Sequence, residues 1–153
     1  MTESTLKFMN QLYNLGEISS NWLAKLHSAV SLLARLYIAK IFFFAGLTKI
    51  QDWETTLFLF EEEYAVPLLS PELAAFLGTF GELVFPILLV AGLFTRYSAI
   101  ALSIVNIVAV ISLEEIAPAA LYLHVIWGVL LAQLVVYGGG RLSLDTFIKR
   151  KFS

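Results

Sequence analysis

Four long apolar stretches constrain this chain more than any other feature of its sequence. They run over about Ser28–Leu47, Leu73–Leu93, Tyr97–Leu113 and Ile116–Tyr137. A bilayer core of ~30 Å needs ~20 helical residues, with a lower limit of ~17, so the third stretch, which has 17 residues, is the shortest that can span. We therefore expect an all-α, polytopic four-helix membrane bundle.

The composition argues against other classes of protein. Of the 153 residues, 59% are hydrophobic and 14% are charged, whereas soluble domains carry about 25% charged residues. A soluble domain of this size cannot hide so much apolar surface, because much of its area must face water. A soluble bundle, a disordered chain and a nucleic-acid-binding module are therefore disfavoured, and the net charge of −2 indicates no polyanionic partner.

Basic residues predict the direction in which the chain crosses the membrane. If the N-terminus lies in the cytoplasm, Lys49 falls on the outer side, where the connections are otherwise acidic. Seven cations then fall on the cytoplasmic side: Lys7, Lys25, Arg96, Arg141, Lys149, Arg150 and Lys151. Because an excess of Lys and Arg marks cytoplasmic segments, we expect both termini to be cytoplasmic.

The first outer connection is long enough to hold a helix of its own. Within it Trp53, Leu57, Phe60 and Tyr64 recur at spacings of 4, 3 and 4, which places them on one helical face. We expect this short helix to lie on the outer membrane surface, with its aromatic side toward lipid.

The spans divide the chain into three parts. Residues 1–27 form an N-terminal arm, which we expect to lie in the cytoplasm and along the inner membrane interface. Residues 28–145 form the four-helix membrane domain. Residues 146–153 form a basic cytoplasmic tail.

Polar side chains inside the spans are the candidate functional residues. They are Arg35, Lys40, Glu82, Asn106, His124 and Gln133. A charge near the bilayer centre costs ~2.5–3.5 kcal/mol on insertion scales, so we expect these side chains to point into the bundle and pair. At ~1.5 Å per residue, Lys40, Glu82, Asn106 and His124 fall within about 4 Å of the centres of their spans. Arg35 lies further inward, but its side chain is long enough to reach Glu82.

Two interpretations of this polar layer stay open. In the first, the charges are an ionic staple that fixes the packing of the helices. In the second, Arg35, Lys40, Glu82, Asn106 and His124 line a pocket for a proton, a quinone head group or a small redox substrate. Charged residues within a membrane more often mark function than stability. Either Arg35 or Lys40 is a candidate partner of Glu82.

The sequence contains no self-contained catalytic motif. Cysteine is absent, which excludes disulfides, thiolate ligation of iron and thiol exchange by this chain. His27 and His124 lie at different depths, so one haem iron cannot bind both. We expect no metal site, and no cofactor is evident in the sequence, although a quinone is compatible with the polar layer.

Several short motifs follow one another in a fixed order. They are Arg35-Leu-Tyr-Ile-Ala, Ala45-Gly-Leu-Thr-Lys49, Glu82, Gly92-Leu-Phe-Thr-Arg96 and Gly140-Arg-Leu-Ser-Leu-Asp145. The ordered set resembles the DoxX family of small four-helix inner-membrane proteins. By position, the resemblance carries over Arg35, Lys49, Glu82 and Arg96 as family-motif residues. Lys40 stands where the family usually has an apolar or small residue.

The resemblance implies a location in the bacterial inner membrane and a link to membrane redox chemistry. Relatives are associated with thiosulfate:quinone oxidoreduction, or act as membrane partners of soluble detoxification enzymes. The segment Phe58–Leu69, with its Glu-Tyr-Ala-Val-Pro sequence, further resembles a bacterial subgroup. Members of that subgroup are encoded near peptide-modifying iron enzymes and small metal-binding peptides.

We therefore expect a quinone-linked redox subunit, or a membrane partner of a redox system, that takes electrons from a soluble or membrane redox partner. The alternative is a non-enzymatic membrane partner, which docks or helps export a modified metal-binding peptide through the acidic outer connection. A proton-coupled carrier is less favoured, because the spans show no repeat. Membrane lipid surrounds the protein in either case, and a homo-oligomer is compatible with the sequence.

Overall fold

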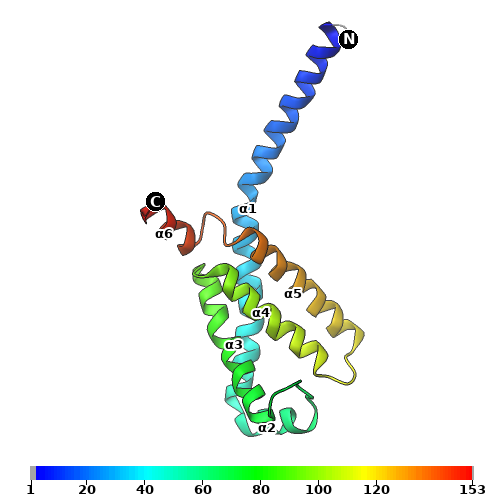
Figure 1. Cartoon of the computed structure of the whole chain (residues 1–153), viewed down its shortest axis with the longest axis vertical. Helices are drawn as coiled ribbons and strands as arrows, with labels where there is room; N and C mark the ends of the chain where they lie inside the picture. Colours follow the sequence, from blue (N-terminus) through cyan, green and yellow to red (C-terminus); the bar gives the residue numbers. More distant parts are fainter. Residues whose placement is uncertain (1–2, 153) are drawn as a thin grey trace.

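The described part of the chain consists of six helices and connecting segments. The computed structural model describes residues 3–152, except for the side chain of residue 24. The helices are α1 (Glu3–Gln51), α2 (Trp53–Glu62), α3 (Pro71–Ala91), α4 (Thr95–Ile111), α5 (Pro118–Tyr137) and α6 (Leu144–Phe152). The helices α1, α3, α4 and α5 form an antiparallel bundle, as predicted (Figure 1). One end of this bundle carries α2, and we call it the α2 end; the opposite end, which carries α6, is the α6 end.

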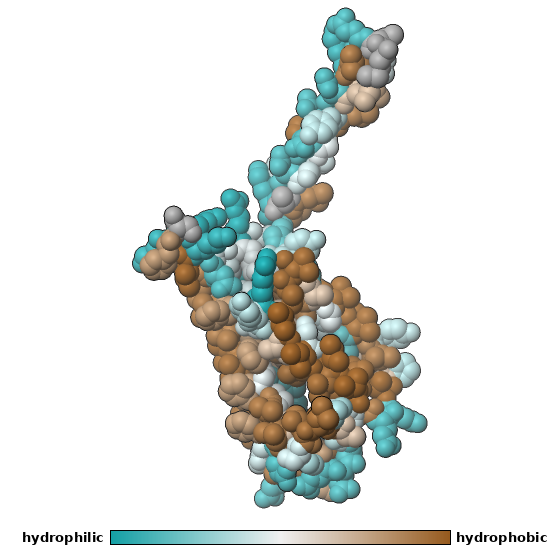
Figure 2. Space-filling view, viewed as in Figure 1, coloured by the Kyte–Doolittle hydropathy of each residue, from teal (hydrophilic) through white to brown (hydrophobic). Residues whose placement is uncertain are grey.

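Helix length and hydropathy make the chain a multi-pass membrane protein. Three helices are long and apolar enough to cross a bilayer, namely α1, α3 and α5. The apolar helix α4 has 17 residues, which is at the lower limit of ~17 for a span. On the face of the bundle that Figure 2 shows, apolar residues form a broad area, with polar residues gathered toward its two ends.

The helix α1 extends beyond the predicted first span in both directions. Its 49 residues measure roughly 74 Å at ~1.5 Å per residue, and its N-terminal part projects from the bundle (Figure 1). Residues 3–27 continue this helix, and no proline lies between Glu3 and Gln51 to end it. That residues 1–27 lie in the cytoplasm and along the inner membrane interface stays a prediction. The structure therefore has no break between residues 27 and 28.

The helix α2 confirms the predicted short helix, but its apolar face contacts protein. Phe60 is buried against Ala74 and Ala75 of α3, and Leu57 and Tyr64 pack on the same cluster. The prediction that this face lies toward lipid is therefore wrong for Leu57, Phe60 and Tyr64, whereas Trp53 is exposed. The two alanines leave room for the Phe60 ring, so the helix folds back onto the N-terminal part of α3.

Close packing holds the four long helices together. Their shared core is built from Ile38, Phe42, Leu89, Leu102, Leu131 and Leu134. Because lipid is as apolar as this core, helices in a membrane associate through tight packing and polar contacts. Gly46 allows a close approach of α1 to α3, since a Cβ atom there would lie 2.9 Å from the Leu83 side chain and 3.0 Å from Glu82 Cβ.

The tight turn between α3 and α4 is held by the first turn of α6. Gly92 and Phe94 adopt left-handed backbone conformations in this turn, with φ of 69° and 50°. The Asp145 carboxylate accepts hydrogen bonds from the amides of Phe94 and Thr95, each at 2.8 Å. The Asp145 amide donates to the Gly92 carbonyl at 2.9 Å. Two of the sequence motifs therefore form one structural unit at the α6 end.

Candidate functional site

The predicted polar layer divides into three separate groups. Arg35 lies at the α6 end, Lys49 pairs with Glu82, and Asn106 pairs with His124. The hydrogen bonds and ion pairs of the described residues do not join these groups into one pocket. Lys40 belongs to none of them, because its side chain is exposed on α1.

Arg35 is bound entirely by backbone carbonyl groups. Its side chain is 1% exposed. Nε donates to the Leu89 carbonyl at 2.7 Å, and Nη2 donates to the Val90 carbonyl at 2.6 Å, at the C-terminus of α3. Nη1 donates to the carbonyls of Gly139 at 3.0 Å and Leu142 at 2.8 Å, in the segment after α5. The carbonyl end of a helix carries a partial negative charge, so this site stabilises a cation without a carboxylate in contact.

The structure gives Glu82 a partner other than the two cations that we considered. Lys49 Nζ lies 2.6 Å from Glu82 Oε2. Arg35 precedes Lys49 by fourteen residues, or about 21 Å along the helix, and therefore cannot reach this carboxylate. Lys40 precedes Lys49 by nine residues, a rotation of about 180° at 3.6 residues per turn, so it lies on the opposite face of α1.

The error in the predicted pairing comes from the end of the first span. The sequence pattern placed that end at Leu47, which left Lys49 in the outer connection. The helix continues to Gln51, and the antiparallel register places Gly46 beside Glu82. Lys49 then follows one turn later on the same face. The side chains of Lys49 and Glu82 are 23% and 10% exposed, so the pair is partly open.

Asn106 and His124 form a reciprocal pair between α4 and α5. Asn106 Nδ2 donates to the His124 carbonyl at 2.9 Å. This bond turns Asn106 Oδ1 toward the imidazole, where it lies 2.8 Å from His124 Nδ1. An amide oxygen can only accept, so Nδ1 carries the proton in this arrangement. In the neutral ring, Nε2 is then left as a hydrogen-bond acceptor.

Trp127 is a polar neighbour that the sequence analysis did not single out. Its ring lies edge-on to His124, with centroids 4.8 Å apart, and to Phe42 on α1, with centroids 6.1 Å apart. Its Nε1 atom is buried, and no described residue accepts its hydrogen. The signal in the sequence was the spacing of three residues from His124, which places both rings on one side of a helix.

Gln133 and the family-motif residue Arg96 each make one side-chain hydrogen bond, away from the two pairs. Gln133 Nε2 donates to Ser31 Oγ at 3.3 Å, which joins α5 to α1. Arg96 is exposed at the α6 end, and its Nη2 donates to the Val136 carbonyl at 3.1 Å. Neither residue contacts the Lys49–Glu82 or Asn106–His124 pair.

An acidic cavity of about 360 Å³ lies at the α2 end. Its carboxylate groups belong to Glu61, Glu62, Glu63, Glu114 and Glu115. Burial, with the nearby charges of Glu63 and Glu82, raises the pKa of the Tyr64 hydroxyl in its wall. Within residues 3–152, no group of three His, Asp or Glu side chains is arranged to hold a metal ion.

Comparison with known proteins places this helical bundle in a family. DoxX-family sequences match residues 30–115. The chain belongs to the DoxX family. An uncharacterized protein of Haemophilus influenzae is 34% identical over 135 residues, which cover 82% of this chain and 87% of that protein. No solved structure matches the chain significantly. The DoxX match includes Arg35, Lys49, Glu82 and Arg96, whereas His124 and Trp127 lie beyond it.

Proposed function

We propose that this DoxX-family protein is the membrane subunit of a quinone-linked redox system. The head group would bind beside Asn106, His124 and Trp127, in the half of the bundle near α2. The observation that carries the proposal is the buried Trp127 Nε1 atom without an acceptor. A buried donor left unpaired costs ~1–3 kcal/mol, and a bound carbonyl oxygen would remove that cost.

The hydrogen-bonding groups fit both redox forms of a quinone. Trp127 Nε1 is a donor only, so it suits a carbonyl oxygen. Neutral His124 offers Nε2 as an acceptor, because Asn106 fixes the proton on Nδ1. This acceptor suits the hydroxyl hydrogen of a quinol. The bound quinone would supply the capacity to accept electrons and protons.

The Lys49–Glu82 pair supports the proposal because it offers a proton donor and acceptor near the proposed head-group site. The helices α3 and α4 touch at Gly81 and Val105, the residues adjacent in sequence to Glu82 and Asn106. The charge pair thus lies close in level to the Asn106–His124 pair. Glu82 would take up or release a proton, and Lys49 would stabilise its charged form. Electrons would come from a partner protein.

The acidic cavity favours a second candidate function. Five glutamates surround it at the α2 end, and a concave acidic surface attracts cationic partners. In this alternative the protein is a non-enzymatic membrane partner that docks or helps export a modified metal-binding peptide. The peptide would need positive charge to bind this acidic surface.

Tryptophan fluorescence tests the quinone proposal directly. The chain has three tryptophans, so Trp22→Phe/Trp53→Phe leaves Trp127 as the single reporter. Trp22 and Trp53 are exposed, at 65% and 37%, and their replacement should leave the fold intact. We expect a short-chain quinone to quench Trp127 saturably in this background. His124→Phe should weaken quenching by about tenfold, the loss of one well-placed hydrogen bond to a buried ligand.

Ser103→Ala is the matched control for this experiment. Ser103 lies on α4 near Asn106, and its hydroxyl is bound to the Ala99 carbonyl, so its loss should not change quinone binding. Quenching that does not saturate, or that is equal in the His124→Phe and Ser103→Ala variants, would contradict the proposal. In that case, binding of a cationic metal-binding peptide, lost in Glu62→Gln/Glu115→Gln, would support the docking alternative.

A further inference from the structure

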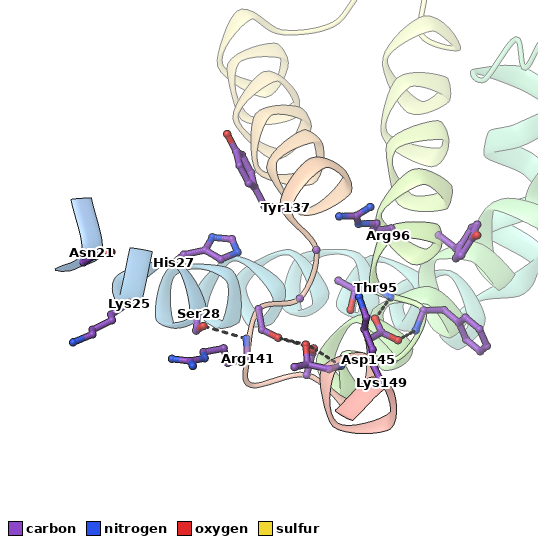
Figure 3. Close-up of a pocket in the computed structure, with 17 residues that line it drawn as sticks. Asn21, Lys25, His27, Ser28, Thr95, Arg96, Tyr137, Arg141, Asp145 and Lys149 are labelled. Atoms are coloured by element: carbon purple, nitrogen blue, oxygen red, sulfur yellow. Dashed lines mark hydrogen bonds between the residues drawn. The ribbon is translucent and has the colours of Figure 1, made fainter. Parts of the chain in front are cut away.

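A large cavity lies at the α6 end, away from the Lys49–Glu82 and Asn106–His124 pairs, and its wall includes Gly139, whose carbonyl accepts a hydrogen bond from Arg35. Its volume is about 950 Å³, at the upper limit of the ~300–1,000 Å³ typical of ligand sites. Helices α1, α4 and α6 and the glycine-rich segment after α5 form its walls (Figure 3). The close-up shows that residues far apart in the sequence face this space together, among them Ser28, Thr95 and Arg141.

The charged lining of the cavity is mainly basic. It contains Lys25, Arg96, Arg141 and Lys149, against the single carboxylate of Asp145. That carboxylate is already bound by two backbone amides at the start of α4. The side chains of Arg141 and Lys149 make no hydrogen bond or ion pair with any described residue. The cavity therefore presents uncompensated positive charge to an anionic ligand.

A buried hydroxyl group in the wall also lacks a partner. Thr95 is 1% exposed, and its Oγ1 atom makes no hydrogen bond with the described residues. Buried hydroxyls are normally paired, and this one lines the basic cavity. It can donate to an oxygen of the same anion that the cations attract.

The surroundings of the cavity favour a lipid as the source of that anion. Phe94, Tyr97 and Tyr137 line it and are 59–72% exposed, and exposed aromatic residues of this kind gather at membrane interfaces. The adjacent helix α6 is amphipathic. Its apolar residues, spaced for one helical face, are exposed: Leu144, Phe147, Ile148 and Phe152. The other side of the helix carries Lys149 and Arg150, and Lys151 follows in its last turn with its Nζ atom 5.8 Å from the centre of the Phe152 ring. Basic residues beside an apolar face are typical of a helix that lies on an anionic membrane surface.

We propose that the cavity at the α6 end binds the phosphate of an anionic phospholipid from the adjacent leaflet. Arg141 and Lys149 neutralise the head group, the Thr95 hydroxyl donates to a phosphate oxygen, and α6 lies in the interface with its apolar face in the acyl region. This lipid site is independent of the proposed quinone site, which lies toward the opposite end of the bundle.

Native mass spectrometry of the purified full-length chain tests the proposal. Phosphatidylglycerol and phosphatidylcholine are titrated separately, because they share acyl chains and differ in net charge. We expect wild type to prefer phosphatidylglycerol by about tenfold or more, since each Lys or Arg near an anionic head group contributes appreciably. Arg141→Gln/Lys149→Gln should abolish most of this preference. Thr95→Val should lower the affinity for phosphatidylglycerol without lowering thermal stability.

The matched control is Arg150→Gln/Lys151→Gln, which removes two charges from α6 that do not line the cavity. It should retain the lipid preference. Equal binding of the two lipids by wild type would overturn the proposal, as would an equal loss in the two double variants. Displacement of phosphatidylglycerol by millimolar inorganic phosphate would show that a free anion is the ligand and would also overturn it.

Discussion

Two cations on α1, the buried Arg35 and the partly exposed Lys49, are held in opposite ways. Arg35 is fixed by four backbone carbonyls at distances of 2.6–3.0 Å. Lys49 is held by one side chain, Glu82, at 2.6 Å, and both members of that pair keep some exposure. Backbone carbonyls cannot move or change protonation state without unfolding, whereas a carboxylate can do both. Arg35 is therefore suited to a structural role, whereas the Lys49–Glu82 pair can also move and exchange protons.

The same contrast separates the DoxX motifs of this chain. Arg35 binds the α3 terminus and the segment after α5, and Asp145 holds the adjacent turn. These motifs together lock the α6 end. Lys49 and Glu82 join α1 to α3 nearer the α2 end. The motifs with Arg35 and Asp145 therefore stabilise the fold, whereas Lys49 and Glu82 are groups that can take part in proton transfer.

The largest expected effect comes from Arg35→Lys, which keeps the charge but removes the planar fork. A lysine ammonium is compact and cannot reach four divergent carbonyls. Each buried group that is left unpaired costs ~1–3 kcal/mol, so we expect a loss of about 3 kcal/mol or more. Thermal unfolding in detergent measures this effect, with Arg141→Lys as the exposed control. Equal melting temperatures in the two variants would refute the structural role of Arg35.

The sequence predicted the elements of this fold better than it predicted their register. Apolar stretches of the right length identified α1, α3 and α5 as spans, because a bilayer imposes length and hydropathy on any helix that crosses it. The spacing of Trp53, Leu57 and Phe60 also located α2. The partner of that helix face could not be predicted, since protein and lipid offer similarly apolar surroundings.

The sequence identified most of the polar residues inside the bundle but not which of them contact one another. Charge and depth singled out Glu82, Asn106 and His124. Glu82 and Asn106 are buried, His124 is half-buried, and Asn106 and His124 indeed meet. The depth of a residue in its span does not show which side of the helix faces the bundle. Small errors in the predicted helix ends also change which residues of neighbouring helices lie side by side. Lys40, at the expected depth, therefore proved to be exposed, while Lys49, outside the predicted span, proved to be the partner of Glu82.

The second largest loss of stability is expected when one member of the Lys49–Glu82 pair is removed, and the double variant tests whether folding needs the pair. Lys49→Met leaves a buried carboxylate without its partner, a change that costs ~3–5 kcal/mol in fully buried pairs. Partial exposure reduces that cost, so we expect about 2 kcal/mol. Lys49→Met/Glu82→Leu should return to within about 1 kcal/mol of wild type, because apolar side chains can replace an ion pair. A double variant as unstable as Lys49→Met would contradict this interpretation.

A smaller effect should come from the Asn106–His124 pair. Asn106→Leu removes two hydrogen bonds between α4 and α5 and should cost about 1–2 kcal/mol. His124→Phe removes only the ring contact and should cost less. In a double-mutant cycle, we expect a coupling energy of about 1 kcal/mol. Strictly additive effects would show that the ring bond contributes nothing to stability.

The smallest effect is expected at the N-cap of α2, which is exposed to solvent. The Thr55 amide and hydroxyl donate to the Asp52 carboxylate, which lowers its pKa below the ordinary 3.8. A carboxyl whose pKa is lower in the folded state stabilises that state above its unfolded pKa. This stabilisation is lost as the pH falls through the folded pKa, in the range below 3.8.

Hydrogen exchange of the α2 amides measures this local effect better than global unfolding does. Wild-type α2 should lose protection as the pH is lowered below about 4, once the intrinsic pH dependence of exchange is subtracted. Asp52→Asn keeps an acceptor oxygen for the Thr55 amide but cannot titrate, so its protection should not change over that range. Glu54→Gln, which removes a charge next to the cap, is the control and should behave like wild type. The α1 amides next to Arg35 should show no such transition in any variant, because the hydrogen-bond partners of Arg35 are backbone carbonyls, which do not titrate in this range. A transition that survives in Asp52→Asn would place the titrating group elsewhere in the acidic α2 end.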